Sequence, residues 1–490
     1  MIEHLDVVVV GAGLSGVAAG HYLKTKCPKK TFAIFEARDA IGGTWDLFRY
    51  PGIRSDSDMY TLGYRFRPWR GGKAIADGAS ILEYVRETAR EEGLEPHIRF
   101  HHRVVSAAWS TTDARWTVKV ATPSGEETFT ASFMIMCSGY YDYDGGYTPE
   151  LPGLERFRGR VVHPQKWTDD IDYEGKRVVV IGSGATAVTL VPELAKKAEH
   201  VVMLQRSPTY IVSLPAVDPI AKFLTKRLSV ERAYDVTRWK NVILSMAMYN
   251  LSRRFPARMK KVFVGGVKKS LGKDYDVGTH FTPTYGPWDQ RLCLVPDGDL
   301  FDAIKAGRAE VVTDHIETFT ERGILTKSGH EIEADLVVTA TGLAVSLLGK
   351  MSVSVDGEAI DVAKTLTYKG TMFSDVPNLF VALGYTNASW TLKCDLTCEW
   401  VCRIMNVMEK RGQRFIVARR RGVDRHGRSR SAIGDETPII DFSSGYIQRA
   451  KDKLPKQGPK APWRLYQNYV LDLIALRYGR IEDDVVELHG

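Results

Sequence analysis

Two short apolar runs, each followed at once by a glycine-rich turn, divide the chain into two similar units. The first run is residues 5–10 (LDVVVV) before Gly11, and the second is residues 176–181 (KRVVVI) before Gly182. Apolar runs of four to eight residues bounded by glycine are typical of strands that are buried on both faces of a parallel sheet. Each unit is therefore predicted to begin with a strand, a turn and a helix, as dinucleotide-binding domains do.

The turn of the first unit has the spacing of a pyrophosphate-binding loop. Gly11 makes the tight turn, Gly13 lets the backbone approach the phosphates, and Gly16 lets the helix and the strand pack closely. The next predicted strand, residues 31–35, ends in Glu36, whose carboxylate suits a ribose 2′-hydroxyl and would repel a 2′-phosphate. The first site is therefore expected to bind FAD or NAD and not NADP. A glycine-rich turn without a ligand is the alternative.

The second unit repeats this fingerprint with one chemical change. Gly182, Gly184 and Ala187 occupy the three fingerprint positions, but the second strand ends in a glutamine followed by Arg206, where the first unit has an acid. A guanidinium can pair with the 2′-phosphate that a carboxylate would repel. The second site is therefore predicted to bind NADPH, with Arg206 and its neighbour Ser207 among the contacts. A solvated surface arginine is the alternative for Arg206.

An irregular loop follows the first unit, with the sequence GGTWDLFRYPGIRSD over residues 42–56. Its glycines and its Pro-Gly pair oppose regular structure, yet it combines aromatic with charged residues. Beside a nucleotide site, such a loop is expected to form a wall of the cofactor pocket. A surface ion pair between Arg54 and Asp56 is the alternative. The loop residues assigned to cofactor binding are Gly43, Thr44 and Trp45.

Residues 214–289 interrupt the α/β pattern and are predicted to form a helical insertion. Within them, residues 219–273 contain fourteen Lys and Arg against two Asp and Glu, a local net charge of +12 that exceeds the +8 of the whole chain. Apolar residues lie among these charges, so a basic face and an apolar face could associate weakly with an anionic membrane surface. A helical lid with a solvated basic face is the alternative. Nucleic acid is not an expected partner, because no binding motif accompanies the charge.

Several features of the sequence favour a location in the cytoplasm. The chain has no run of eighteen apolar residues, and Glu3 and Asp6 at its start oppose a signal peptide. Its six cysteines form no disulfide-like framework. Three of them, Cys394, Cys398 and Cys402, share one helical face without a histidine, which favours buried thiols over a metal site. Contact through residues 219–273 would place the protein at the periphery of the membrane. The basic run 418–430 is expected to be a flexible surface loop.

The length of 490 residues is too great for one ordinary core. The expected fold class is α/β, with two Rossmann-like dinucleotide-binding domains, one for FAD and one for NADPH, and a helical insertion in the NADPH domain. The predicted parts are residues 1–140 (FAD domain, first part), 151–213 (NADPH domain, first part), 214–289 (insertion), 290–342 (NADPH domain, second part) and 343–490 (FAD domain, second part, with the C-terminal region).

The segment Phe157-x-Gly159-x-x-x-His163-x-x-x-Trp167, between the two units, resembles the fingerprint of Baeyer–Villiger monooxygenases, which are class B flavoprotein monooxygenases. The loop 42–56 is similar to their second signature. The resemblance extends over nearly the whole chain and is closest to the ethionamide-activating monooxygenases of actinobacteria. Two positions depart from the family pattern. They are Thr168, where the fingerprint has Pro or Asp, and Gln290, where many relatives have lysine.

The resemblance implies an activity and roles for residues. NADPH would reduce FAD, and O2 would form a C4a-peroxyflavin that converts ketones to esters or lactones and also oxidises sulfides. Such an anion needs a fixed cation and exclusion of water. The resemblance assigns the cation to Arg291 and its orientation to Asp56. Phe157, Gly159, His163 and Trp167 would act through the orientation of the two domains.

Three alternatives to this function remain at the level of sequence. A flavin-containing monooxygenase would oxygenate soft nitrogen or sulfur atoms, but that group usually has Tyr or Phe at the position of Trp167. A flavin disulfide reductase needs a close cysteine pair, whereas Cys394 and Cys398 are spaced CxxxC. A membrane-surface protein with a vestigial nucleotide fold would explain the basic insertion but not the retention of every cofactor motif.

Overall fold

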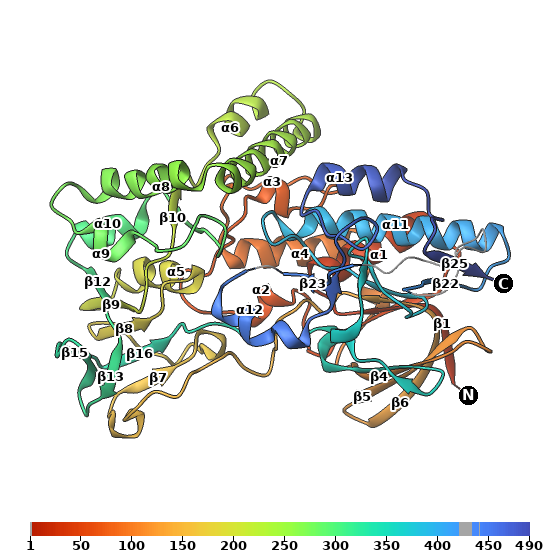
Figure 1. Ribbon diagram of the computed structural model, residues 1–490, viewed down its shortest axis with the longest axis horizontal. Helices are drawn as coiled ribbons and strands as arrows, with labels where there is room; N and C mark the ends of the chain where they lie inside the picture. The colour runs from red at the N-terminus through yellow and green to blue at the C-terminus, as the bar shows by residue number, and fades with distance from the viewer. Residues whose placement is uncertain (1, 421–433, 441) are drawn as a thin grey trace.

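The computed structural model describes residues 2–420, 434–440 and 442–490, and two sheet-based units lie side by side in it (Figure 1). Each unit draws its strands from two separate parts of the chain. The larger unit uses strands before residue 137 and after residue 351, and the smaller one uses strands between residues 160 and 339. The chain therefore crosses between the units twice.

The larger sheet has a parallel half and an antiparallel half. In the parallel half, β1 lies between β2 and β6, β3 extends the edge beyond β2, and β21 pairs with the end of β6. In the antiparallel half, β4 and β5 form a meander with β6. The strands are β1 (Glu3–Val10), β2 (Phe32–Phe35), β3 (Ile98–Arg99), β4 (Arg103–Ser110), β5 (Arg115–Thr122), β6 (Gly125–Met136), β17 (Ser352–Val355), β18 (Glu358–Ala359), β19 (Thr367–Tyr368), β20 (Met372–Phe373) and β21 (Leu379–Val381).

Helices cover one face of this sheet, and the side chains of β1 alternate between the two faces. Val7 and Val9 pack with the helices, whereas Val8 and Val10 pack in a second core that contains Trp109. Burial on both faces explains the unbroken apolar run that predicted this strand. The helices of the unit are α1 (Leu14–Lys26), α2 (Thr44–Leu47), α3 (Met59–Leu62), α4 (Gly78–Glu91) and α11 (Trp390–Lys410).

The smaller sheet is entirely parallel, in the order β12-β9-β8-β16-β7. One face packs against helices α5 and α10, and the other packs against a small antiparallel sheet of β13, β14 and β15. The elements are β7 (Arg160–Val162), β8 (Arg177–Ile181), α5 (Ala185–Leu194), β9 (His200–Gln205), α10 (Asp299–Lys305), β12 (Ala309–Thr313), β13 (Ile316–Phe319), β14 (Gly323–Thr326), β15 (Glu331–Glu333) and β16 (Leu336–Thr339).

The helical insertion leaves the smaller unit after β10 (Ile211–Leu214) and returns at β11 (Cys293–Pro296), two strands that pair in parallel. Its helices α6, α7 and α8 lie along the upper edge of the molecule in Figure 1, and α7 packs on α3 of the larger unit. The insertion therefore joins the two units from the outside. Its helices are α6 (Pro219–Thr225), α7 (Val230–Arg254), α8 (Pro256–Leu271) and α9 (Val277–Phe281).

The two crossing segments run antiparallel to each other. The N–H of Asp142 donates to the carbonyl of Ala344 at 2.8 Å, and the N–H of Tyr147 donates to the carbonyl of Gly342 at 3.0 Å. Tyr141 and Val345 form an isolated β-bridge next to the first of these hydrogen bonds, and the N–H of Ser346 donates to the carbonyl of Tyr140 at 3.0 Å on its other side. The connection between the units is therefore a short two-stranded ribbon.

The C-terminal part of the chain packs on the larger unit through short elements. A strand pair, β22 with β25, holds the chain end beside α11, and α13 continues into one π-helical turn. The elements are β22 (Phe415–Ala418), β23 (Thr437–Pro438), α12 (Gly445–Ala450), β24 (Lys456–Gln457), α13 (Tyr469–Leu473), the π turn Ile474–Tyr478 and β25 (Val486–His489).

The predicted α/β class, with two Rossmann-like units and a helical insertion, is confirmed. The strand expected over residues 31–35 is β2, Phe32–Phe35. All six cysteines are free and buried. Most of the loop expected over residues 418–430 lies outside the described residues. Among the residues that are described, no helix is long and apolar enough to cross a membrane.

Candidate active site

A cavity of about 650 Å³ lies between the two units and reaches both glycine-rich turns. Its walls come from the first turn, the loop 42–56, both crossing segments and the residues before β11. The predicted site residues on these walls are Gly11, Gly13, Glu36, Gly43, Thr44, Trp45, Asp56, Gly184 and Arg291.

The first turn has the close packing that its glycines predict. Gly11 has φ +102°, and a Cβ atom there would lie 2.7 Å from the carbonyl oxygen of Cys137. A Cβ atom on Gly16 would lie 1.8 Å from the carbonyl oxygen of Gly11, so only glycine lets α1 pack this closely on β1. Gly13 is the N-cap residue of α1, and the first helical turn faces the cavity. Its free N–H groups can therefore bind a pyrophosphate.

Glu36 follows β2 at the carboxyl edge of the sheet and is 6% exposed. One carboxylate oxygen accepts the N–H of Ala12 at 2.7 Å, and the other accepts the N–H of Arg38 at 2.9 Å. These two bonds fix the carboxylate beside the glycine turn. A carboxylate has about four acceptor positions, so the remaining ones can accept hydroxyl groups of a ribose.

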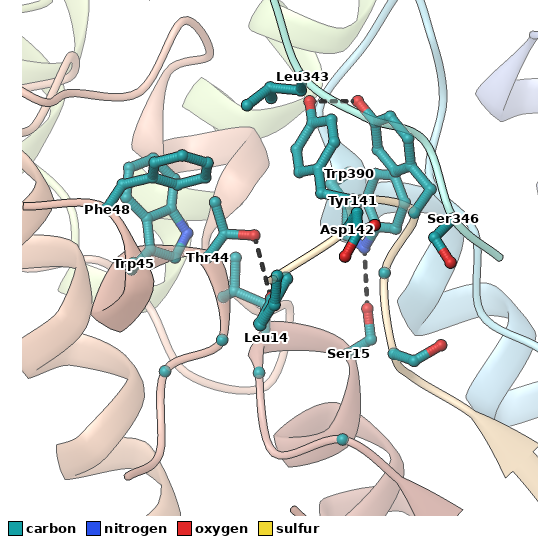
Figure 2. A pocket seen from close by; sticks show the side chains of 18 of the residues that line it. Leu14, Ser15, Thr44, Trp45, Phe48, Tyr141, Asp142, Leu343, Ser346 and Trp390 are labelled. Carbon is teal, nitrogen blue, oxygen red and sulfur yellow. Dashed lines mark hydrogen bonds between the residues drawn. The ribbon is translucent and has the colours of Figure 1, made fainter. Parts of the chain in front are cut away.

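The loop 42–56 packs directly against the first turn. A Cβ atom on Gly43, which has φ +56°, would lie 3.0 Å from Cα of Gly13. A buried carboxylate, Asp46, holds the loop through Arg38 at 2.6 Å and Arg86 at 2.7 Å. Figure 2 shows Trp45 and Phe48 of this loop on one side of the cavity and Tyr141 and Trp390 on the other. The hydroxyl groups of Thr44 and Tyr143 lie 3.5 Å apart.

Arg291 and Asp56 form an ion pair on the cavity wall. The Nε atom of Arg291 lies 2.9 Å from one oxygen of Asp56, and an Nη atom donates to the other oxygen at 3.2 Å. The charge of Asp56 raises the pKa of Arg291 further above its ordinary value, against the opposing effect of burial. The side chain of Arg291 remains 33% exposed, so a fixed cation faces the cavity.

The alternative of a surface pair between Arg54 and Asp56 is wrong. Arg54 pairs instead with Asp299, at the start of α10 in the smaller unit. Arg54 and Asp56 are therefore both paired with residues of the other unit, because this end of the loop crosses the interface between the units.

An aromatic group that the sequence analysis did not assign to the site forms the remaining wall. The hydroxyl groups of Tyr140 and Tyr141 lie 2.6 Å apart, and the ring of Tyr140 stacks on Trp390 with centroids 5.2 Å apart. The indole N–H of Trp390 donates to the hydroxyl of Ser15 at 2.8 Å, within the first turn of α1 (Figure 2). Only the position of Ser15 inside the glycine fingerprint could have suggested this contact.

The second turn repeats the geometry of the first, with more space around its second glycine. Gly182 has φ +134°, and a Cβ atom there would lie 2.4 Å from the carbonyl oxygen of Ala340. Gly184 has open space around it, whereas Ala187, in the first turn of α5, is fully buried. Ser183 donates to the carbonyl of Ser207 at 3.0 Å, which fixes the end of β9 beside the turn.

Arg206 and Ser207 are exposed at the carboxyl end of β9 and do not line the cavity. Arg206 forms no ion pair with any residue that the structure describes. Its guanidinium is therefore free to bind an anion at the edge of the parallel sheet, where nucleotides bind in open α/β folds.

The fingerprint residues lie outside the cavity. Phe157 packs edge-on against Phe319, and Gly159 is so close to the Phe157 ring that its Cβ atom would lie 2.5 Å away. Trp167 is 8% exposed and belongs to the core of the smaller unit. His163 instead contacts the crossing segments, and its Nε2 atom lies 3.1 Å from the carbonyl oxygen of Gly342.

The residues present fit two dinucleotides. Each unit offers a glycine, Gly11 or Gly182, at which a Cβ atom would collide with the backbone. Each also offers a helix N-terminus and a strand end, which carries an acid in one unit and an arginine in the other. The fold and the site together define a flavin-dependent oxidoreductase with a second site for a nicotinamide nucleotide.

Comparison with known proteins identifies the family. Residues 75–410 match the Flavin-binding monooxygenase-like family, and residues 9–71 match the NAD(P)-binding Rossmann-like domain. The chain belongs to the flavin-binding monooxygenase-like family, and the prediction of a flavoprotein monooxygenase is confirmed. The FAD-containing monooxygenase EthA of Mycobacterium tuberculosis H37Rv is 54% identical over 485 residues, covering 99% of this chain and 97% of the relative. EthA of Mycolicibacterium smegmatis is 51% identical, with the same coverage.

Solved structures share the fold at lower sequence identity. Oxidised steroid monooxygenase bound to NADP superposes with a TM-score of 0.75 at 23% identity, covering 99% of both chains. OTEMO in complex with FAD and NADP superposes with a TM-score of 0.70 at 22% identity, covering 85% of this chain and 88% of the other. These likenesses support the arrangement of two dinucleotide-binding units.

Proposed function

We propose that this protein is a monooxygenase of the Baeyer–Villiger type, which uses FAD, NADPH and O2 to convert ketones to esters or lactones and also oxidises sulfides. The balanced reaction takes ketone, O2, NADPH and a proton to ester, NADP⁺ and water. When bound, the flavin supplies hydride acceptance from NADPH, activation of O2 and transfer of one oxygen atom to the substrate. The observation that carries the proposal is the ion pair of Arg291 with Asp56 on the cavity wall.

Arg291 is the residue to which we assign the catalytic cation. An anionic oxygen species in a cavity is stabilised by a fixed positive charge that needs no reorganisation during the reaction. Guanidinium keeps its charge at every physiological pH, and the two-point contact with Asp56 restricts its rotation. Asp56 is then a positioning residue, because it affects the reaction only by orienting Arg291.

Aromatic side chains line the cavity around this cation. Burial raises the pKa of Tyr141, so its hydroxyl stays neutral and can donate a hydrogen bond beside Arg291. Trp45 and Phe48 face it across the cavity. A dry site strengthens the electrostatic effect of Arg291 and protects a reactive oxygen species from hydrolysis.

The nucleotide contacts follow from the two glycine turns. We assign the FAD pyrophosphate to the turn with Gly11, Gly13 and Gly16, and its ribose to Glu36. Gly43, Thr44 and Trp45 would cover the flavin side of that site. The NADPH pyrophosphate goes to the turn with Gly182, Gly184 and Ala187, and its 2′-phosphate goes to Arg206 and Ser207.

The test is NADPH consumption by the FAD-loaded enzyme against a matched panel of ketones and sulfides, with identification of each product. We expect ester or lactone from at least one ketone and sulfoxide from at least one sulfide, with one NADPH oxidised per product. Sulfoxide or N-oxide without any ester would contradict the Baeyer–Villiger assignment and favour an enzyme that oxygenates only soft nitrogen or sulfur atoms.

A further inference from the structure

The outward surface of the helical insertion carries several large apolar side chains, which is unusual for a helix that faces solvent. On α7 the exposed positions recur at helical spacing and carry large apolar side chains that are 42–58% exposed. We define the apolar ridge as these residues of α7 with their exposed neighbours on α6, namely Ile220, Phe223, Val236, Trp239, Ile243, Leu244 and Leu251.

The apolar ridge continues onto the C-terminal part of the chain. The ring of Trp239 contacts that of Tyr469 at the start of α13, with centroids 5.7 Å apart. From there, Leu471 and Ile474 add side chains that are 46% and 55% exposed. Figure 1 shows α6, α7 and α13 along one edge of the molecule. Segments more than 200 positions apart therefore contribute to one apolar surface.

Basic residues that we call the basic rim accompany this ridge on the insertion. Its members are exposed and form no ion pair with the residues that the structure describes, whereas the only acids of residues 219–273 are Glu231 and Asp235. By contrast, Lys240 and Arg253 are neutralised by Asp218 and Asp289. The basic rim consists of Lys222, Lys226, Arg227, Arg232, Arg254, Arg258 and Lys261.

From this surface we infer that the protein binds an anionic lipid bilayer peripherally, with the apolar ridge inserted among the headgroups and the basic rim against the lipid phosphates. An apolar stripe bordered by unpaired cations is the pattern of a helix that lies in a membrane interface. A second copy of this chain fits less well, since a symmetric dimer would bring the basic rim against itself. The ridge also does not act as a lid, because no residue of α6, α7 or α8 lines the described cavity.

The experiment is co-sedimentation of the FAD-loaded full chain with vesicles of phosphatidylglycerol or of phosphatidylcholine, at low and high salt. We expect binding to phosphatidylglycerol at low salt, with a loss of about tenfold or more in the partition constant at high salt. Ile243→Glu should lower the partition constant by a similar factor. The matched control is Ile2→Glu, because Ile2 is 60% exposed, close to the 58% of Ile243. Ile2 lies outside the insertion, immediately before β1 of the larger sheet.

A second variant set tests the basic rim. The first triple variant combines Lys222→Glu, Lys226→Glu and Arg227→Glu and should abolish binding. The control triple variant changes the net charge equally at exposed sites outside the insertion, and it should weaken binding far less. It combines Lys29→Glu, Lys327→Glu and Lys410→Glu. Unchanged FAD absorbance and NADPH oxidation show that each variant is folded.

The position of the ridge can be read from fluorescence. Brominated phosphatidylglycerol should quench tryptophan emission of the wild type, and Trp239→Phe should remove most of that quenching while binding persists. Wild-type protein that stays in the supernatant with phosphatidylglycerol, or that binds both lipids equally at all salt concentrations, would overturn the inference. A dimer in sedimentation velocity that Ile243→Glu dissociates would assign the ridge to a second copy instead.

Discussion

The imidazole of His163 is bonded to the carbonyl oxygen of Gly342, at 3.1 Å from its Nε2 atom, where the chain returns from the smaller unit to the larger one. Its Nδ1 atom accepts the N–H of Gln165 at 3.2 Å. Together these contacts require the neutral ring with hydrogen on Nε2. A Cβ atom on Gly146 would lie 1.9 Å from the ring, so the outgoing segment also packs on His163. His163 therefore connects both crossing segments.

This connection should weaken in acid. Burial, as the largest cause, lowers the pKa of His163 below its ordinary 6.5. The unfolded chain then binds the proton more readily, so the stabilisation is complete above about pH 6.5 and is lost as the pH falls through the folded-state pKa. His163→Gln keeps a donor for Gly342 but does not titrate. We expect the wild type to be more stable than His163→Gln by about 1 kcal/mol at pH 8, and this advantage to shrink towards pH 5.

Thermal unfolding of both proteins, followed by flavin fluorescence from pH 8 to pH 5, measures this difference. An advantage that is constant over the whole range would show that protonation of His163 does not affect the connection between the units.

Coenzyme preference tests the second nucleotide site. If Arg206 holds the 2′-phosphate, Arg206→Ala should reduce the preference for NADPH over NADH by about 2 kcal/mol, the scale of a charge-assisted contact. The matched control is Arg308→Ala, since Arg308 is exposed but precedes β12 and so lies at the opposite, amino edge of the same parallel sheet. The ratio of kcat/KM values for the two coenzymes gives the measurement. Equal use of NADH and NADPH by the wild type would refute the assignment.

The local parts of this site could be predicted from the sequence because their spacing encodes backbone geometry. Gly11 has a positive φ and a carbonyl oxygen at contact distance, so its position requires glycine. That glycine is recognisable in the sequence because it directly follows its strand. Glu36 could be placed for the same reason, since it ends the next strand of the same sheet. The helical insertion could also be predicted, because its composition differs from that of the α/β segments that flank it in the sequence.

Long-range partners could not be predicted in this way. Asp56 lies 235 positions from Arg291, and the family resemblance, not the spacing, suggested that pair. The sequence allows an ion pair of Arg54 with Asp56, yet Arg54 pairs with Asp299 because the loop crosses to the other unit. The stacking of Tyr140 on Trp390 depends on how α11 packs beside the crossing segment, and no local pattern records that packing.

One buried cation contributes to the attachment of the insertion to the larger unit. The guanidinium of Arg238 on α7 donates to the carbonyls of Tyr60 at 2.7 Å and Gly63 at 2.8 Å, and it lies 3.5 Å from the carboxylate of Asp395 on α11. Arg238→Met should destabilise the protein by about 3–5 kcal/mol, because it leaves Asp395 buried without its counter-ion. Arg232→Met on the same helix is the matched control, since Arg232 is exposed, and should change stability by less than about 0.5 kcal/mol.

Chemical denaturation of both variants measures this difference. Adding Asp395→Leu to Arg238→Met should recover part of the loss, as replacement of both charges of a buried pair commonly does. Equal stability of Arg238→Met and the wild type would show that packing alone holds α7 on the larger unit.

The role of Arg291 can be separated from a merely structural one by following where the electrons go. Hydride transfer from NADPH to the flavin does not require a cation beside the substrate, so Arg291→Ala should still bind FAD and oxidise NADPH. Oxygenated product should fall at least about a hundredfold, equivalent to roughly 3 kcal/mol of lost stabilisation, and hydrogen peroxide should appear instead. Asp56→Ala should show the same uncoupling more mildly, because the cation remains but its two-point contact is lost.

The control for both variants is Arg253→Ala, which removes the exposed ion pair with Asp289 and should stay coupled. The measurement is the ratio of product to NADPH consumed, with peroxide assayed in parallel; an Arg291→Ala enzyme that forms product at the wild-type ratio would exclude this arginine as the catalytic cation.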